Sequence, residues 1–170
     1  MDKMKTLASD LLQKIPRSRT QTRINILTYD NIIDWKETRD LSQAKLKEAI
    51  DDLDLRRPRS EYSLPLFTKT INQALSDNSR KGVQSAILVI IDGAPNREIL
   101  EYLNSLAKND GDSKEGDGDD RKVTLVMTSG KIRDIPGDVV VEPNLDIVSG
   151  DASVGDVDTI VKRIKPGNFI

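Results

Sequence analysis

The chain has 170 residues, with 26 basic and 28 acidic side chains and a formal net charge of −2 at pH 7. This balance argues against a general nucleic-acid binder, because affinity for phosphate depends on an excess of Lys and Arg. The chain contains neither His nor Cys, which excludes cysteine nucleophiles, disulfides, Ser-His-Asp triads and the usual zinc sites. A bound metal would have to be a hard ion held by oxygen, such as Mg²⁺ or Ca²⁺. The length predicts a single domain over residues 1–170.

The sequence carries no secretory signal, no apolar stretch long enough to span a bilayer and no Asn-x-Ser/Thr acceptor site. We therefore expect no membrane insertion. The localisation stays unknown at this stage, because a cytoplasmic protein and an excised fragment of a larger protein both fit the lack of cysteine.

The N-terminal part of the chain alternates between helical and extended patterns. Apolar residues recur at helical spacing before residue 16, and a second amphipathic stretch follows Ser42, a residue type that caps helices. The elements expected here are, in order, a helix over Met1–Ile15, an antiparallel hairpin formed by residues 23–29 and 32–36, a helix after Ser42, a loop over Leu64–Thr70 and a short helix at Ile71–Leu75.

Five consecutive aliphatic residues, Ile87–Ile91, end at Asp92 and Gly93. Such a short, β-branched run predicts a strand buried on both faces, the pattern of parallel sheets. Burying five such side chains contributes roughly 10 kcal/mol, so we expect this strand at the centre of a sheet. Ligands of open α/β sheets bind at the carboxyl ends of central strands, which makes Asp92 a candidate site residue.

The C-terminal part continues the alternation of strands and helices. Residues 109–120 carry no apolar side chain and predict a flexible, acidic surface loop. The other elements expected are a helix from Asn96 to about Lys108, strands at Val123–Met127, Val139–Val141 and Leu145–Val148, and a last helix with its apolar face at Val157–Ile164. Strands alternating with amphipathic helices predict an α/β fold with a mostly parallel sheet flanked by helices.

The order of these parts, together with two motifs, resembles a von Willebrand factor type A domain. Phe67–Leu75 (FTKTINQAL) is similar to that family's Thr-x-Thr-x-x-Ala-Leu loop and helix start. Val89–Gly93 (VIIDG) is similar to its apolar strand ending in Thr-Asp-Gly, with Ile91 where Thr is usual. The resemblance extends over nearly the whole chain and implies a three-layer, Rossmann-like fold.

The resemblance also implies a metal-ion-dependent adhesion site, in which oxygen ligands hold Mg²⁺ and a partner's carboxylate completes the shell. By this likeness Thr68 provides a hydroxyl ligand and Asp92 a carboxylate ligand. The family's main ligands, Asp-x-Ser-x-Ser at the end of its first strand, are absent ahead of the first helix of this sequence. One carboxylate and one hydroxyl compete poorly with water, so we expect Mg²⁺ to bind weakly or not at all.

The absence of that first strand also predicts a gap in the sheet. Each buried main-chain group left unpaired costs about 1–3 kcal/mol, so we expect a strand supplied by another chain or segment. One internal candidate is Leu145–Gly155, in which Asp151 and Ser153 resemble the missing motif. The alternative, which we favour, is that these residues form the last strand and the cap of the last helix, with Ser153 and Asp156 as a capping pair.

These observations favour a non-catalytic, protein-binding or adhesion module of the von Willebrand A type with an incomplete metal site and a protein ligand. One alternative is a structural subunit that keeps the fold without any metal site. Another is a phosphate-using α/β enzyme, but the sequence has neither Gly-x-x-x-x-Gly-Lys-Ser/Thr nor Gly-x-Gly-x-x-Gly. Binding of Mg²⁺ would distinguish the first two hypotheses, and a nucleotide titration would test the third.

Overall fold

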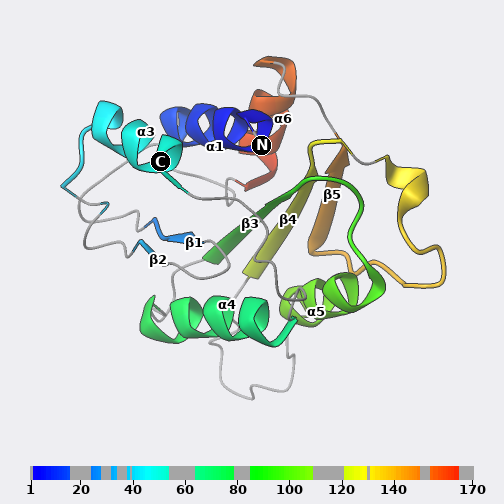
Figure 1. Cartoon of the computed structure of the whole chain (residues 1–170). Coiled ribbons are helices and arrows are strands. Elements are labelled where there is room, and N and C mark those ends of the chain that lie inside the picture. Colours follow the sequence, from blue (N-terminus) through cyan, green and yellow to red (C-terminus); the bar gives the residue numbers. More distant parts are fainter. Residues whose placement is uncertain are drawn as a thin grey trace.

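The computed structural model has three layers, with a parallel sheet between two layers of helices (Figure 1). The connections between parallel strands must return the chain to the same end of the sheet, and helices serve that purpose. The residues that the structure describes are 2–15, 24–27, 32–33, 38, 40–53, 64–78, 85–108, 121–129, 131–149 and 154–164.

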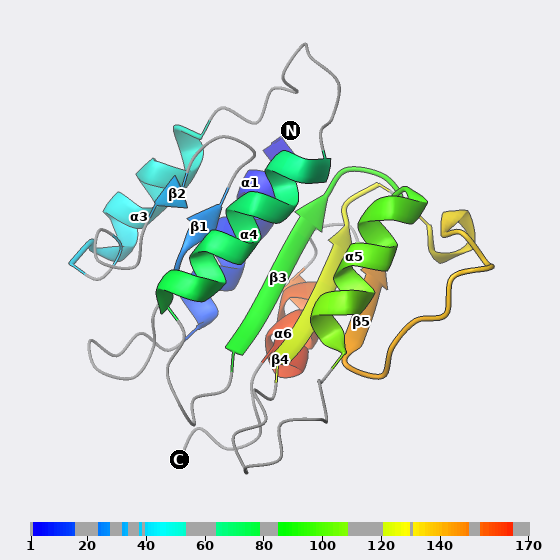
Figure 2. The same cartoon turned by 90° about the horizontal axis from the view of Figure 1, so that it is seen from below.

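The main sheet consists of β3 (Ser85–Ile91), β4 (Arg121–Met127) and β5 (Leu145–Ser149), all parallel and in the order β3-β4-β5. In the register, β4 residue Leu125 lies between Val89 of β3 and Ile147 of β5. Parallel pairing brings the carboxyl ends of the three strands to one end of the molecule (Figure 2). This is the end at which open α/β sheets bind ligands.

The expectation that Ile87–Ile91 is the central strand is wrong for the described sheet, because β3 lies at its edge and β4 is central. The exposure of the side chains follows from this order. Val123, Leu125, Val126 and Met127 of β4 are each 0% exposed, whereas among the β3 residues whose burial is described, 86–91, only Val89 is buried, at 7% exposed. A strand with neighbours on both sides loses its solvent contact, and β3 has one described neighbour.

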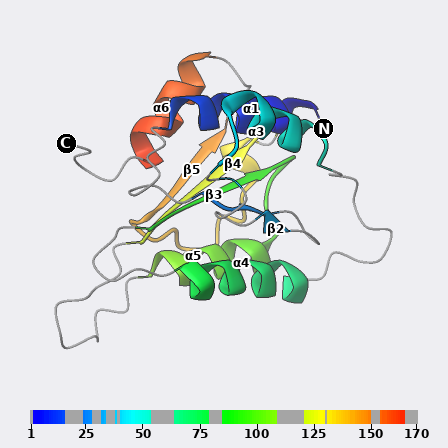
Figure 3. The same cartoon turned by 90° about the vertical axis from the view of Figure 1, so that its left-hand side faces the viewer.

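Helices cover both faces of the sheet (Figures 1 and 3). On one face lie α1 (Asp2–Lys14), α3 (Gln43–Asp51) and α6 (Val154–Ile164), and on the other lie α4 (Leu64–Asn78) and α5 (Arg97–Ala107). Successive side chains of β4 point to opposite faces of the sheet and pack in different cores. Leu125 packs with residues of α4 and α5, and Val126 packs with residues of α1 and α6. The predicted α/β fold is therefore confirmed.

The predicted hairpin is present as a separate two-stranded sheet. It consists of β1 (Ile26–Leu27) and β2 (Ile32–Ile33), which pair antiparallel with Ile26 opposite Ile33. Thr38 anchors the residues before β1, because its hydroxyl donates a hydrogen bond of 2.7 Å to the carbonyl of Ile24. In Figure 2, β1 lies between β2 and the edge of the main sheet.

Two helices begin at the residues expected from the sequence, and in each a side chain caps the first turn. The hydroxyl of Ser42 accepts a hydrogen bond from the amide of Lys45 at the start of α3. The side chain of Asn96 accepts one from the amide of Ile99 at the start of α5. Each cap satisfies an amide that has no partner within the helix, so these helix boundaries are set locally.

The predicted loop over Leu64–Thr70 is wrong, because α4 begins at Leu64 and continues through this segment. Pro65 is compatible with a helix here, since the first turn of a helix needs no amide hydrogen from it. Phe67 and Ile71, four residues apart, both contribute to the core on the α4–α5 face. This packing outweighs the weak helix propensity of the threonines in the segment.

The predicted strand at Val139–Val141 is also wrong, because these residues belong to an irregular segment with Val140 81% exposed. The turn that precedes β5 follows a short 3-10 helix, η1 (Ile132–Asp134). The main chain of the segment pairs with a side chain of α5, Asn104, where a strand would need the main chain of another strand.

Several expectations fall on residues outside the described parts of the chain, namely the loop over 109–120 and the side chains of Asp151, Ser153 and Asp156. The internal candidate for a missing strand is resolved in part, because Leu145–Ser149 is β5 and pairs with β4. Among the helices that the structure describes, none has the length and apolar character needed to cross a bilayer.

Candidate functional site

Asp92 directly follows β3 at the carboxyl end of the sheet, and its side chain is exposed. The next residue, Gly93, has a φ of +90°, a conformation that glycine adopts without strain. This glycine lets the chain turn away directly after Asp92, so the carboxylate stands at the end of the strand. The site residue expected from the sequence therefore lies where a ligand could approach it.

Two hydroxyl groups from the neighbouring strand end hold the Asp92 carboxylate. The Ser129 hydroxyl donates a hydrogen bond to Oδ1 of Asp92. The Thr128 hydroxyl lies 3.2 Å from the same oxygen and 3.3 Å from the carbonyl of Ile91, so its one proton is shared between these two acceptors. The amide of Thr128 donates to the carbonyl of Ile91 at 2.9 Å, which fixes the two strand ends side by side. The sequence analysis missed Thr128 and Ser129, although both directly follow a predicted parallel strand.

Thr68, the other residue assigned to the site, lies within α4 and not in a loop. Its hydroxyl donates a hydrogen bond of 3.1 Å to the carbonyl of Pro65, one turn earlier in the same helix. The N-terminal end of α4 and the carboxyl end of β3 lie toward the same end of the molecule (Figure 2). Thr68 and Asp92 thus share an end of the fold, while their hydroxyl and carboxylate groups contact different partners.

This donor set does not fit a tight magnesium site. Mg²⁺ requires near-octahedral oxygen coordination, usually with carboxylates among the ligands. The structure brings one carboxylate, Asp92, together with the hydroxyls of Thr128 and Ser129, both of which lie against its Oδ1. Within the described residues, no group of three or more acidic side chains is arranged to hold a metal ion.

Tyr102 of α5 connects Thr68 to the α4–α5 interface. Its hydroxyl donates a hydrogen bond of 3.0 Å to the Asn72 side chain and lies 3.4 Å from the carbonyl of Thr68. Its ring packs edge-on against Phe67, with 5.9 Å between the ring centres. Burial raises the pKa of Tyr102 to about 12, which outweighs the opposing charge of Arg121. Tyr102 therefore stays protonated and donates its hydrogen bond at neutral pH.

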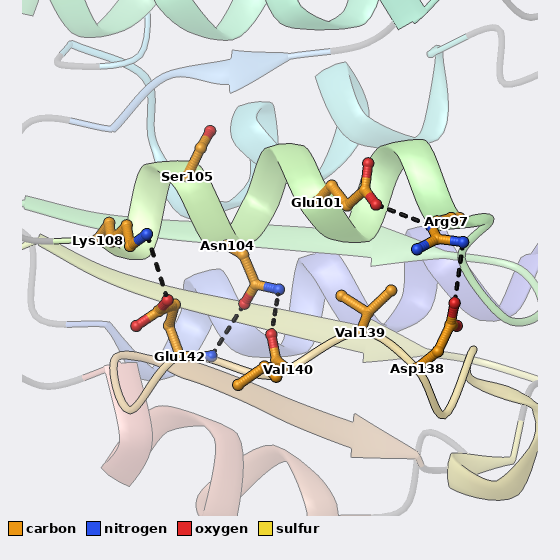
Figure 4. Close-up of a pocket in the computed structure, with 9 residues that line it drawn as sticks. All are labelled: Arg97, Glu101, Asn104, Ser105, Lys108, Asp138, Val139, Val140 and Glu142. Atoms are coloured by element: carbon orange, nitrogen blue, oxygen red, sulfur yellow. Dashed lines mark hydrogen bonds and ion pairs between the residues drawn. The ribbon is translucent and has the colours of Figure 1, made fainter.

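A concave region with a volume of ≈ 300 Å³ lies away from Asp92, between α5 and the segment that precedes β5 (Figure 4). Arg97 pairs with Glu101 at 2.8 Å and with Asp138 at 2.9 Å, and the Glu101 hydrogen bond and Asp138 charge raise the pKa of Arg97. Lys108 faces Glu142 at 4.0 Å. Each of these cations is therefore matched by a carboxylate, which argues against a site for an anion.

The family model for the von Willebrand factor type A domain matches residues 1–113, about two thirds of the 170-residue chain. The chain belongs to the von Willebrand factor type A family. Domains of this family are typically protein-binding modules. Comparisons with curated proteins and with solved structures gave no significant match.

The match includes both motifs on which the resemblance rests, Phe67–Leu75 and Val89–Gly93. In this von Willebrand A chain the first motif forms helix α4 and the second forms the end of β3. The hydroxyl partners of Asp92 lie beyond the matched residues, at the end of β4. The candidate site therefore combines residues inside and outside the match.

Proposed function

We propose that this chain is a non-catalytic, protein-binding module of the adhesion type, with a protein as its ligand. The observation that carries the proposal is the exposed Asp92 carboxylate, held by the Thr128 and Ser129 hydroxyls at the carboxyl end of the sheet. A carboxylate whose position is fixed before binding loses little conformational entropy when it pairs with a cationic or amide group of a partner.

The chemistry of this end supports binding over catalysis. The side chains there are a carboxylate and hydroxyls, and the sequence has no His or Cys to act as a base or nucleophile. A phosphate-using enzyme would need a cluster of main-chain amides or basic groups to hold the phosphate. The acidic Asp92 at this position would repel such a substrate.

The metal site of the family is incomplete in this proposal, and Mg²⁺ contributes weakly or not at all. The support is the donor set: the Thr68 hydroxyl and the Asp92 carboxylate contact different partners, and within the described residues no group of three or more acidic side chains is arranged to hold a metal ion. In calorimetric titrations with Mg²⁺ and with Mn²⁺, we expect the chain and its Asp92→Asn variant to give the same non-saturating heats. Saturable binding that Asp92→Asn abolishes would contradict this part of the proposal.

We also propose that residues 1–170 act as one domain whose partner supplies a strand to the sheet. The sheet supports a single domain, because its strands lie on both sides of the end of the family match at residue 113. β3 lies within the match, while its partner β4 and the next strand, β5, lie beyond it. A protein cut after residue 113 would leave β3 without β4. We therefore expect a fragment of residues 1–113 to lack cooperative unfolding, as measured by circular dichroism during urea titration.

The partner is sought by affinity capture with the full chain, followed by quantitative mass spectrometry. The variant that tests the role of Asp92 is Asp92→Lys. Glu48→Lys is its control, because it makes the same charge change at an exposed position in α3. We expect one or more proteins to be retained in EDTA by the wild type and by Glu48→Lys, and depleted about tenfold with Asp92→Lys. Equal capture by all three proteins would refute a role for Asp92, and capture only with Mg²⁺ would indicate a functional metal site.

A further inference from the structure

The segment between η1 and β5 carries most of the large apolar side chains that the described residues expose. Of four such side chains, three lie in or next to η1 and in this segment: Ile132 at 60%, Val140 at 81% and Val141 at 42%. A single exposed apolar side chain is normal on a protein surface, whereas apolar neighbours mark contact sites. Val140 and Val141 are adjacent, and Val140 lines the concave region beside α5. This surface is therefore a candidate for contact with another molecule.

The middle of this concave region, which we call the α5 cleft, is apolar and held in place. Val139 and Val140 lie there beside Asn104 of α5 (Figure 4). Asn104 bonds both to the carbonyl of Val140 and to the amide of Glu142, and the amide of Val139 donates to the carbonyl of Pro136 at 3.3 Å. Val139 also packs against the core on the α4–α5 face. A surface that is fixed before binding loses little conformational entropy when a partner docks on it.

Charged side chains border the α5 cleft at both ends (Figure 4). At one end, the guanidinium of Arg97 pairs with the carboxylates of both Glu101 and Asp138. At the other end, Lys108 faces Glu142. The first end thus has two carboxylates for one cation, and the second has one of each. The three side chains at the first end are each more than half exposed, so a partner can reach the excess carboxylate.

The size and charge of the α5 cleft limit what it can bind. Its volume of ≈ 300 Å³ lies at the lower limit of small-molecule sites, which span about 300–1,000 Å³. It equals the volume of roughly ten water molecules, which is enough for one large side chain. An aliphatic side chain would displace water from Val139 and Val140. The excess carboxylate favours a cationic neighbour of that side chain and disfavours an anionic one.

We propose that the α5 cleft binds a segment of a partner protein in which a large aliphatic side chain, such as Leu, lies next to Lys or Arg. The aliphatic side chain packs on Val139 and Val140, and the basic one pairs with the carboxylates of Glu101 and Asp138. An apolar centre with a polar, charged rim is the usual arrangement of protein–protein contacts. This inference rests on the proposed function, because it gives the protein-binding module a second contact with its partner. The contact is independent of Asp92 and of any metal.

The first test measures binding of synthetic peptides to the full chain by NMR. The probe is Gly-Arg-Leu-Arg-Gly, blocked at both ends. Gly-Arg-Ala-Arg-Gly lacks the large aliphatic side chain, and Gly-Glu-Leu-Glu-Gly reverses the charge. We expect the probe to shift the signals of the Glu142 amide and the Asn104 side-chain amide in a saturable way. The Ala peptide should bind about tenfold more weakly, because it buries less apolar surface, and the Glu peptide should not bind measurably.

The second test removes apolar surface from the middle of the cleft. Val140→Ser does so at a residue whose side chain is 81% exposed, so the fold does not depend on it. Ile132→Ser is the matched control, because it replaces an exposed aliphatic residue of η1, outside the cleft. We expect Val140→Ser to bind the probe at least about threefold more weakly than Ile132→Ser. Both variants should keep the urea midpoint of the wild type.

The third test removes the excess carboxylate. Asp138→Asn does so at the Arg97 end of the cleft, and Asp134→Asn makes the same charge change in η1, outside the cleft. An exposed ion pair contributes modestly, so we expect Asp138→Asn to bind the probe about threefold more weakly than Asp134→Asn. The difference should shrink at high salt, because ions screen exposed charges. Equal affinities at low salt would refute the choice of a basic partner.

Three further results would overturn the inference: no saturable shift at the Glu142 amide, equal affinity for the Leu and Ala peptides, or equal affinity of Val140→Ser and Ile132→Ser for the probe. Shifts at Glu142 that grow with the concentration of the chain alone would also overturn it, because they would make a second copy the occupant. The proposed function fails separately. A captured partner that binds Val140→Ser and Ile132→Ser equally would refute the cleft while keeping the function. Probe binding without any captured partner would keep the cleft and refute the function.

Discussion

Replacing Asn104 with Ala tests how α5 holds the irregular segment that precedes β5. The Asn104 side chain is 9% exposed. Its amide nitrogen donates to the carbonyl of Val140 at 2.7 Å, and its oxygen accepts from the amide of Glu142 at 3.0 Å. Each hydrogen bond contributes about 0.5–1.5 kcal/mol, so Asn104→Ala should lower the free energy of unfolding by about 1–3 kcal/mol. Water can reach the exposed Val140, which favours the lower half of that range.

Urea denaturation at pH 7 measures the loss of stability, and hydrogen exchange at the Glu142 amide reports the broken contact directly. Ser105→Ala is the matched control, because the hydroxyl of the exposed Ser105 donates to the Tyr102 carbonyl within the same helix. Asn104→Asp separates the two contacts: it keeps an acceptor for Glu142 but places a carboxylate oxygen against the carbonyl of Val140. It should therefore protect the Glu142 amide and still lower stability. If Asn104→Ala costs no more than Ser105→Ala and Glu142 exchanges as in wild type, the reasoning is refuted.

Two further predictions concern stability. Leu125 in the central strand is 0% exposed, so Leu125→Ala should cost about 2–5 kcal/mol, whereas Ile132→Ala, at a residue 60% exposed, should change stability by less than about 0.5 kcal/mol in the same urea titration. Burial raises the pKa of Tyr102 from 10.0 to about 12, so its contribution is present below pH 10 and is lost as the pH rises through 12. Tyr102→Phe should flatten the fall in urea midpoints over that range, and an unchanged slope would contradict the assignment.

Local signals in the sequence predicted much of the fold correctly. The predicted cap Ser42 and the predicted helix start Asn96 lie at the starts of α3 and α5, and both side chains cap their helices, since capping depends on a side chain and an amide three residues away. The aliphatic run Ile87–Ile91 forms a parallel strand, because such a run can be satisfied only by burial. The same run identified Asp92 as a candidate site residue, because Asp92 is the first polar residue after it. Helix starts, the strand and the residue at its end were predictable because each depends on residues that are close together in the sequence.

The threonines of α4 show where local signals misled the interpretation. Thr68 and Thr70 have weak helix propensity, and the family motif suggested a loop, yet the segment is helical from Leu64. Its apolar residues reach the α5 face of the sheet only in a helix, and this packing contributes more than the propensity costs. The interpretation of Val139–Val141 as a strand failed for a related reason, because strand formation depends on a neighbouring strand that the sequence does not identify.

The sequence by itself determined the chemistry available to this protein: polar side chains without His or Cys, an aliphatic strand and a carboxylate at its end. Only the tertiary structure decided how these parts combine. It brought Thr128 and Ser129 to Asp92, coupled Asn104 to the main chain 36 and 38 residues away, and placed β3 at the edge of the described sheet. Composition and periodicity specify that a side chain must be buried. Which strand lies beside it depends on contacts between residues far apart in the chain, and those exist only once the chain has folded.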